Sequence, residues 1–175
     1  MRRLILFRHA KAEASEPGLA DRARVLIERG RKEAAKIGAY MAAHGFTPNR
    51  VAVSPAARTQ ETWKCASAAF DPAPEAVLAP ALYDAPPNAI YGVIKETPDA
   101  VLTLLIVAHN PGLHEVALQL IATGDIEARG RLRERLPTAG LIIIDLAFDA
   151  WSALHAQSGR LERFVSPKWL ETPTR

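Results

Sequence analysis

Short runs of apolar, strand-forming residues alternate along this chain with longer segments whose apolar residues recur at helical spacing. The runs that we predict as strands are residues 4–7, 51–53, 76–78, 101–107, 141–146 and 159–165, the last of them at an edge. Most of these runs are apolar at successive positions, so both faces of each strand are expected to be covered. The alternation therefore predicts an α/β fold with a mainly parallel central sheet, in three layers α/β/α.

Four helices are predicted between these strands. They cover residues 24–45, 54 to about 69, 88–96 and 113 to about 123. Gly30 interrupts the first helix, so a helix that starts at Gly30 is an alternative. Ser54 and Pro55 are predicted to be the N-cap and the first residue of the second helix, because Ser caps helices and Pro is tolerated at their first position.

The chain length and composition agree with one globular domain over residues 1–175. Hydrophobic residues make up 49% of the chain and charged residues 23%, a balance that excludes a disordered chain. The 22 basic and 19 acidic residues leave a formal charge of +3, which is far from that of a polybasic chain. The single cysteine, Cys65, cannot form an internal disulfide. No apolar run is long enough for a signal peptide or a membrane span, so we expect a cytoplasmic protein with no membrane partner.

Polar side chains follow three of the predicted strands, at the points where those strands end. The side chains in question are Arg8, His9, Ser54, Arg58, His109 and Asn110. Carboxyl ends of parallel strands meet at one rim of the sheet, where ligands bind in open α/β folds. Guanidinium groups bind a tetrahedral dianion, and a neutral imidazole is a nucleophile toward phosphorus. The pattern predicts a pocket for phosphate or another oxyanion.

Other kinds of site are not supported. His109 and His114 are five residues apart and have no Cys or carboxylate cluster beside them, so no metal is expected. There is no glycine-rich nucleotide loop, so no cofactor is expected either. The basic run over residues 129–135 is interpreted as a solvated face rather than a nucleic-acid site, and a surface that attracts an anionic protein partner is the alternative.

Arg8-His9-Ala10-Lys11 resembles the signature of the histidine phosphatase superfamily, the phosphoglycerate mutase-like proteins, and within it the SixA-like phosphohistidine phosphatases. The run 21–30 resembles a second SixA-like segment, although Val25 and Ile27 replace its usual Pro and Thr. The segments 54–59 and 107–110 complete the resemblance, which extends from residue 3 to about residue 145.

The resemblance implies a role for each residue of the predicted pocket. His9 is the implied nucleophile, which becomes phosphorylated, and Arg8 and Arg58 bind the phosphoryl oxygens. His109 is the implied second pocket histidine, which donates a hydrogen bond to the transferring group, and Asn110 is grouped with the phosphate-binding residues. Asp84 is the candidate general acid, with Glu75 and Glu96 as weaker alternatives and a simple turn residue as the competing interpretation.

These roles predict a metal-independent phosphatase that acts through a phosphohistidine intermediate. Only residues 79–100 separate the third and fourth predicted strands, so the pocket should be open enough for a phosphohistidine on the surface of a partner protein. A phosphatase of small phosphate esters or nucleotides is one alternative, and a phosphoprotein-binding protein without turnover is another. Nucleic acid is not an expected partner.

Overall fold

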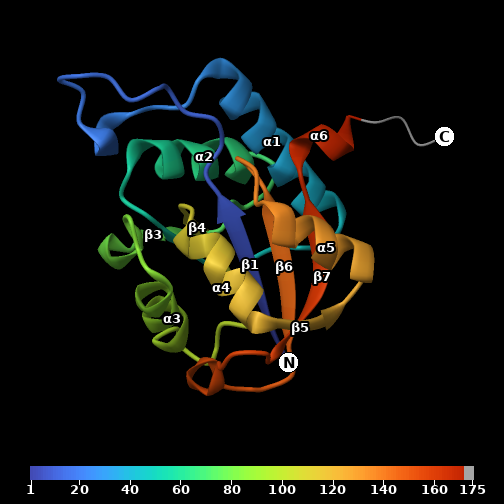
Figure 1. Ribbon diagram of the computed structural model, residues 1–175. Helices are drawn as coiled ribbons and strands as arrows, with labels where there is room; N and C mark the ends of the chain where they lie inside the picture. The colour runs from blue at the N-terminus through green and yellow to red at the C-terminus, as the bar shows by residue number, and fades with distance from the viewer. Residues whose placement is uncertain (172–175) are drawn as a thin grey trace.

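The computed structural model describes residues 1–171 and is built around a seven-stranded sheet with helices on both faces (Figure 1). The strand order is β3-β2-β4-β1-β6-β7-β5. The strands are β1 Arg2–Arg8, β2 Arg50–Val53, β3 Ala76–Leu78, β4 Thr103–Ala108, β5 Ile121–Gly124, β6 Leu141–Leu146 and β7 Gly159–Val165. Strands β3, β2, β4 and β1 are mutually parallel, whereas β6 is antiparallel to both β1 and β7. The predicted α/β class with a mainly parallel sheet is confirmed.

Within the described residues, six α-helices cover the sheet. They are α1 Glu28–Ala43, α2 Ala57–Ser67, α3 Pro87–Lys95, α4 Gly112–Leu120, α5 Ile126–Glu134 and α6 Pro167–Leu170. Helices α1 and α2 pack together over one face, while α3, α4 and α5 contribute to the core on the other. No helix within residues 1–171 is long and apolar enough to cross a membrane.

The alternation of side chains along the central strand produces the two cores. In β1, Leu4 and Leu6 belong to the core under α3 and α4, whereas Ile5 and Phe7 belong to the core under α1 and α2. Successive side chains of a strand point to opposite faces, so an unbroken apolar run is needed where both faces are covered. This is why the run 4–7 is apolar at every position.

The first two predicted helices begin later than expected. Residues 24–27 are extended rather than helical, because Leu26 forms an antiparallel bridge with Ala12 and its N–H donates to the Glu61 carboxylate at 2.6 Å. Helix α1 then starts at Glu28 and runs through Gly30 without a break. The N-cap of α2 is Ala56, not Ser54, because the Ser54 hydroxyl bonds to His109 instead.

The carboxyl-terminal third of the chain differs more from the prediction. Helix α4 ends at Leu120, and Ile121–Gly124 forms strand β5 alongside β7. The edge strand on this side is therefore β5, and the prediction of β7 as an edge strand was wrong. Helix α5, which contains most of the basic run, was not predicted because its charged residues hide the helical pattern; Leu132 is its one buried residue.

Candidate active site

A pocket of about 610 Å³ lies at the carboxyl ends of β1, β4 and β2, which are neighbours in the sheet. Its lining includes the predicted residues Arg8, His9, Arg58, Asp84, His109 and Asn110. Ser54 is not part of this lining and bonds to His109 instead. His9 directly follows β1, His109 directly follows β4, and Arg58 lies in the first turn of α2. The strand order thus brings together residues that are up to 102 positions apart in the chain.

The His9 ring is held in one tautomer by its own backbone. Its Nδ1 lies 2.8 Å from the Ala10 carbonyl oxygen, which can only accept, so Nδ1 carries the proton and Nε2 keeps its lone pair. Burial first, and the charges of Arg8 and Arg58 to a smaller extent, lower the pKa of His9 to about 3. A neutral imidazole with a free Nε2 can act as a nucleophile near neutral pH.

Hydrogen bonds to β4 and α2 fix the backbone on either side of the His9 side chain. The backbone N–H of His9 donates to the Ala108 carbonyl at 3.1 Å, and the N–H of Ala10 donates to Thr62 Oγ1 at 3.0 Å. Thr62 lies on α2, and its hydroxyl donates to the carbonyl of Arg58 at 2.6 Å. The two segments that contain the histidine and the arginine are therefore joined through one buried threonine.

His109 is bonded at both ring nitrogens. Arg58 Nη2 donates to Nδ1 at 3.3 Å, so Nε2 carries the proton and donates to Ser54 Oγ at 2.7 Å. The resemblance implies that His109 donates a hydrogen bond to the phosphoryl group. In this tautomer, however, no N–H of the ring is free to do so. Burial and then the charge of Arg58 lower the pKa of His109 to about 4. Its ring centroid lies 5.3 Å from that of His9.

Both arginines are anchored to backbone carbonyls and keep a donor that has no partner in the described chain. Arg8 Nη1 donates to the Leu136 carbonyl at 2.9 Å, and Arg58 Nη1 donates to the Asp21 carbonyl at 2.8 Å. The buried Nε atoms of both arginines have no hydrogen-bond partner among residues 1–171. Buried donors are rarely left unpaired in folded proteins, so these two indicate a site that binds an anion.

Asp21 and Tyr83 complete the pocket wall, and neither was predicted to have a role in the site. The Asp21 carboxylate accepts hydrogen bonds from Tyr83, Arg24 and Arg58. These bonds, that of Tyr83 foremost, hold the pKa of Asp21 well below its ordinary value. The resemblance of the run 21–30 pointed to Asp21, whereas no sequence signal pointed to Tyr83, whose ring meets that of His109 edge-on at 5.7 Å.

Asn110 and Asp84 lie on the side of the pocket toward α3 and α4. Asn110 Nδ2 donates to the Leu136 carbonyl at 3.0 Å, which it shares with Arg8, while its buried Oδ1 has no partner in the described chain. Asp84 is exposed at the rim with a φ of 47°. Glu75 and Glu96, the weaker candidates for the general acid, do not line the pocket.

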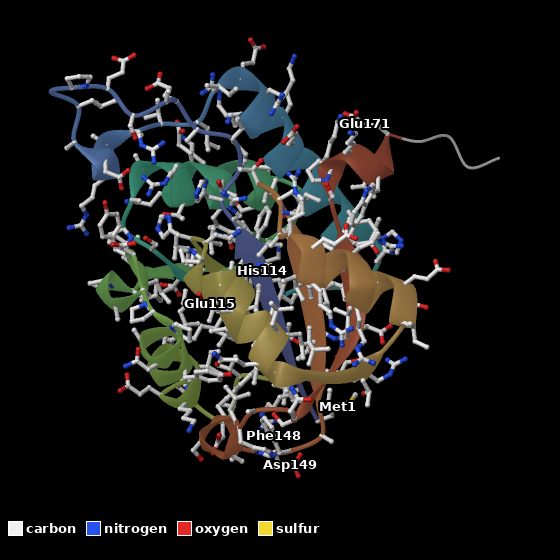
Figure 2. All side chains as sticks on the ribbon, viewed as in Figure 1. Met1, His114, Glu115, Phe148, Asp149 and Glu171 are labelled. Atoms are coloured by element: carbon white, nitrogen blue, oxygen red, sulfur yellow. The ribbon has the colours of Figure 1, made fainter. Side chains whose placement is uncertain are left out.

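Within residues 1–171, no three His, Cys, Asp or Glu side chains are grouped as ligands of a metal ion. His114, on α4 (Figure 2), instead donates from Nε2 to the Leu132 carbonyl of α5 at 2.5 Å. The pocket lining itself offers three guanidiniums, one ammonium, two imidazoles and two carboxylates. Of these groups, Arg8, Arg58 and the two neutral histidines are the ones suited to phosphate chemistry.

Comparison with known proteins identifies relatives over nearly the whole chain. A model of the Histidine phosphatase superfamily (branch 1) matches residues 4–85. The uncharacterized protein ML1117 of Mycobacterium leprae is 32% identical over 170 residues, which cover 92% of this chain and 99% of that protein. A crystal structure assigned as phosphohistidine phosphatase SixA from Agrobacterium tumefaciens superposes with a TM-score of 0.80 at 28% identity, covering 95% of this chain and 98% of that one. A structure assigned as an α-ribazole-5'-P phosphatase from Escherichia coli, at 16% identity and a TM-score of 0.68, shares the fold over 95% of this chain and 98% of that one.

Proposed function

This chain belongs to the histidine phosphatase superfamily and has a SixA-like fold, and from that premise we propose that it removes the phosphoryl group from phosphohistidine on a partner protein. The observation that carries the proposal is the free Nε2 of a neutral His9 beside two arginines with unpaired buried donors. A phosphatase reaction needs a nucleophile and fixed positive charge at one place, and the pocket supplies both.

In the first step, His9 Nε2 attacks the phosphorus in line with the leaving group. A P–N bond to His9 forms while the P–N bond to the substrate imidazole breaks. The electron pair of the broken bond goes to the leaving nitrogen, which takes up a proton from water. Arg8 and Arg58 hold the phosphoryl oxygens, and their positive charge stabilises the spread negative charge of the transition state. The bond from His9 Nδ1 to the Ala10 carbonyl keeps the ring oriented while Nε2 carries the phosphoryl group.

In the second step, water attacks the same phosphorus from the face that the substrate imidazole has left. The P–N bond to His9 breaks and its electron pair returns to Nε2. The oxygen of the water becomes the fourth oxygen of inorganic phosphate, and the two protons of the water stay on the phosphate or pass to solvent. His9 is again neutral because its burial beside Arg8 and Arg58 disfavours the imidazolium form. The cycle consumes one water and leaves the enzyme unchanged.

Two features favour phosphohistidine over a small ester. The leaving imidazole has a pKa of about 6.5 and accepts its proton readily, so a strong general acid is unnecessary. The pocket rim also contains the exposed residues Lys11, Asp21 and Asp84, so it is accessible to a side chain presented on a protein surface. The alternative is a phosphatase of small phosphate esters, because the same fold is shared by a structure assigned to that class.

The test is phosphate release, measured in EDTA, from a histidine-phosphorylated protein, from N-phosphoimidazole and from a sugar phosphate. We expect the wild-type protein to hydrolyse the phosphohistidine protein fastest and His9→Ala to lose activity on every substrate. His155→Ala is the matched control, because His155 is exposed and, within residues 1–171, its ring bonds only to the nearby Ala153 carbonyl. Faster turnover of the sugar phosphate would replace the proposal by the small-ester alternative.

A further inference from the structure

A second hollow, of about 500 Å³, adjoins the candidate active site between α1, α6 and the segment that precedes β6. Thr138 lines both the hollow and the active-site pocket, so the two are continuous. We call this hollow the basic groove, because five cationic side chains line it: Arg29, Lys32, Lys36, Arg135 and Lys168. Only two carboxylates, Glu33 and Glu171, lie in its walls.

Part of this positive charge is not neutralised locally. Arg29 pairs with Glu33 at 3.4 Å, Lys32 with Glu28 at 3.4 Å, and Lys36 with Glu171. Arg135 and Lys168 are exposed and have no carboxylate partner among residues 1–171. A surface with unpaired cationic side chains attracts a partner of opposite charge and steers its approach.

The basic groove is joined to the active site through the backbone. Arg135 directly precedes Leu136, whose carbonyl accepts hydrogen bonds from both Arg8 and Asn110. Burial first, and the charge of Arg135 second, lower the pKa of Arg8. A ligand seated at Arg135 would therefore lie next to the phosphate pocket.

The opposite side of the active site has the opposite charge. A hollow of about 250 Å³ adjoins the pocket at Asp84 and Asn110, and Glu115 of α4 also lines it. No Lys or Arg is among the residues that line this hollow. Figure 2 shows Glu115 well apart from Glu171, and Glu171 is the one that lines the basic groove. The rim of the active site is thus polarised, with cations toward α1 and α6 and carboxylates toward α3 and α4.

We propose that the basic groove docks an acidic patch on the surface of the phosphorylated protein while the phosphoryl group occupies the active-site pocket. This inference rests on the proposed function and adds what the partner surface must carry beside its phosphohistidine. A protein suits the groove better than a nucleic acid, because no aromatic residue among residues 1–171 lines the groove and a base would find no ring to stack on. The nearby Trp169 is also not free for base stacking, since the Arg131 guanidinium lies 5.2 Å over its ring and Phe164 meets it edge-on at 5.1 Å.

The experiment compares two phosphohistidine peptides that differ only in having Glu or Gln at the positions on both sides, with N-phosphoimidazole as the small substrate. We expect the wild-type protein to hydrolyse the Glu peptide with a kcat/KM about 3- to 10-fold above that of the Gln peptide. This preference should shrink when the salt concentration rises from about 50 mM to about 500 mM, because exposed charges are screened.

The double variant Arg135→Glu/Lys168→Glu should lose the preference for the Glu peptide and keep its activity on N-phosphoimidazole. The matched control is Arg129→Glu/Arg133→Glu, which changes the formal charge equally and, like Arg135→Glu, alters the α5 region. Arg129 and Arg133 line a separate hollow beside Leu118 and Gln157, so the control should keep the preference. Equal hydrolysis of both peptides by the wild type, or equal loss in both double variants, would overturn the docking proposal.

A binding measurement separates this inference from the proposed function. Fluorescence anisotropy with the unphosphorylated Glu and Gln peptides reports docking even if no substrate is hydrolysed. Tighter binding of the Glu peptide that depends on Arg135 and Lys168 would support the groove as a docking surface whether or not the proposed reaction stands. Tighter binding of a DNA or RNA oligonucleotide through the same two residues would overturn the assignment to a protein partner.

Discussion

Ser54 Oγ lies 2.7 Å from His109 Nε2. Ser54 directly follows β2 and is fully buried. A hydroxyl can donate or accept, so Ser54 is compatible with either neutral tautomer of His109. With Arg58 bonded to Nδ1, His109 donates to Ser54. If an oxyanion draws Arg58 away from Nδ1, the Ser54 hydroxyl can donate to Nε2 and leave an Nδ1–H for the phosphoryl group. Ser54 is thus a positioning residue for the donor role that the sequence analysis gives to His109.

Ser54→Ala should therefore lower kcat by about tenfold while changing KM little, since one charge-related hydrogen bond in the transition state is worth about 1.4 kcal/mol. It should also destabilise the fold by about 1–3 kcal/mol, because His109 Nε2 would be buried without a partner. Ser54→Thr keeps the hydroxyl and serves as the control. The ¹⁵N shifts of His109, recorded with and without inorganic phosphate, report the tautomer, and an unchanged tautomer would contradict this account.

The two pocket histidines should make the fold sensitive to acid. Their pKa values are about 3 for His9 and about 4 for His109, against 6.5 in the unfolded chain. Between these values the unfolded chain binds more protons, so the free energy of unfolding falls as the pH falls from about 6.5 to about 4. Each histidine contributes at most about 1.4 kcal/mol per pH unit. Denaturant unfolding at several pH values should show a shallower slope in His9→Gln and an unchanged slope in His155→Gln.

Asp21→Asn should separate the two effects of the Asp21 carboxylate. The carboxylate holds Arg58 in place at 3.1 Å, and its negative charge also competes with an anionic ligand. We expect kcat to fall, while inorganic phosphate binds up to about fivefold more tightly because an exposed charge of the same sign is removed. Calorimetric titration measures the binding, with the remote and exposed Glu75→Gln as control. Weaker phosphate binding would mean that holding Arg58 is the dominant effect.

The sequence predicts the centre of this site better than its wall. His9, Ser54 and His109 directly follow strands β1, β2 and β4, so the rule for parallel strands is enough to bring them together. The contact between Asp21 and Tyr83 depends instead on how residues 10–27 fold back over the pocket, and no local pattern fixes that path. Strand β5 was missed because Ile121 continues the apolar spacing of α4, and only pairing with β7 decides its conformation.

Gly30→Ala should damage both the fold and the site. A Cβ at this position would lie 2.1 Å from the Lys11 carbonyl oxygen, so α1 could not approach the segment that follows His9. We expect a loss of about 1–3 kcal/mol of stability and lower phosphatase activity. Gly92→Ala in α3 is the control, since nothing lies within 4 Å of its Cβ, and it should stabilise the protein by about 0.5–1 kcal/mol. Thermal unfolding of both variants checks the pair, and equal stability would contradict the close approach.

Asp84→Asn tests the general acid. Asp84 lines the pocket with a φ of 47°, and Asn tolerates this left-handed conformation, so the backbone should be preserved. If Asp84 protonates the leaving group, the variant should lose about 10²-fold or more on an alkyl phosphate, whose alkoxide needs a proton. Hydrolysis of N-phosphoimidazole should fall much less, because imidazole leaves with little assistance. The ratio of the two kcat values is the measurement. An equal loss on both substrates would show that Asp84 acts on the shape of the pocket and not as an acid.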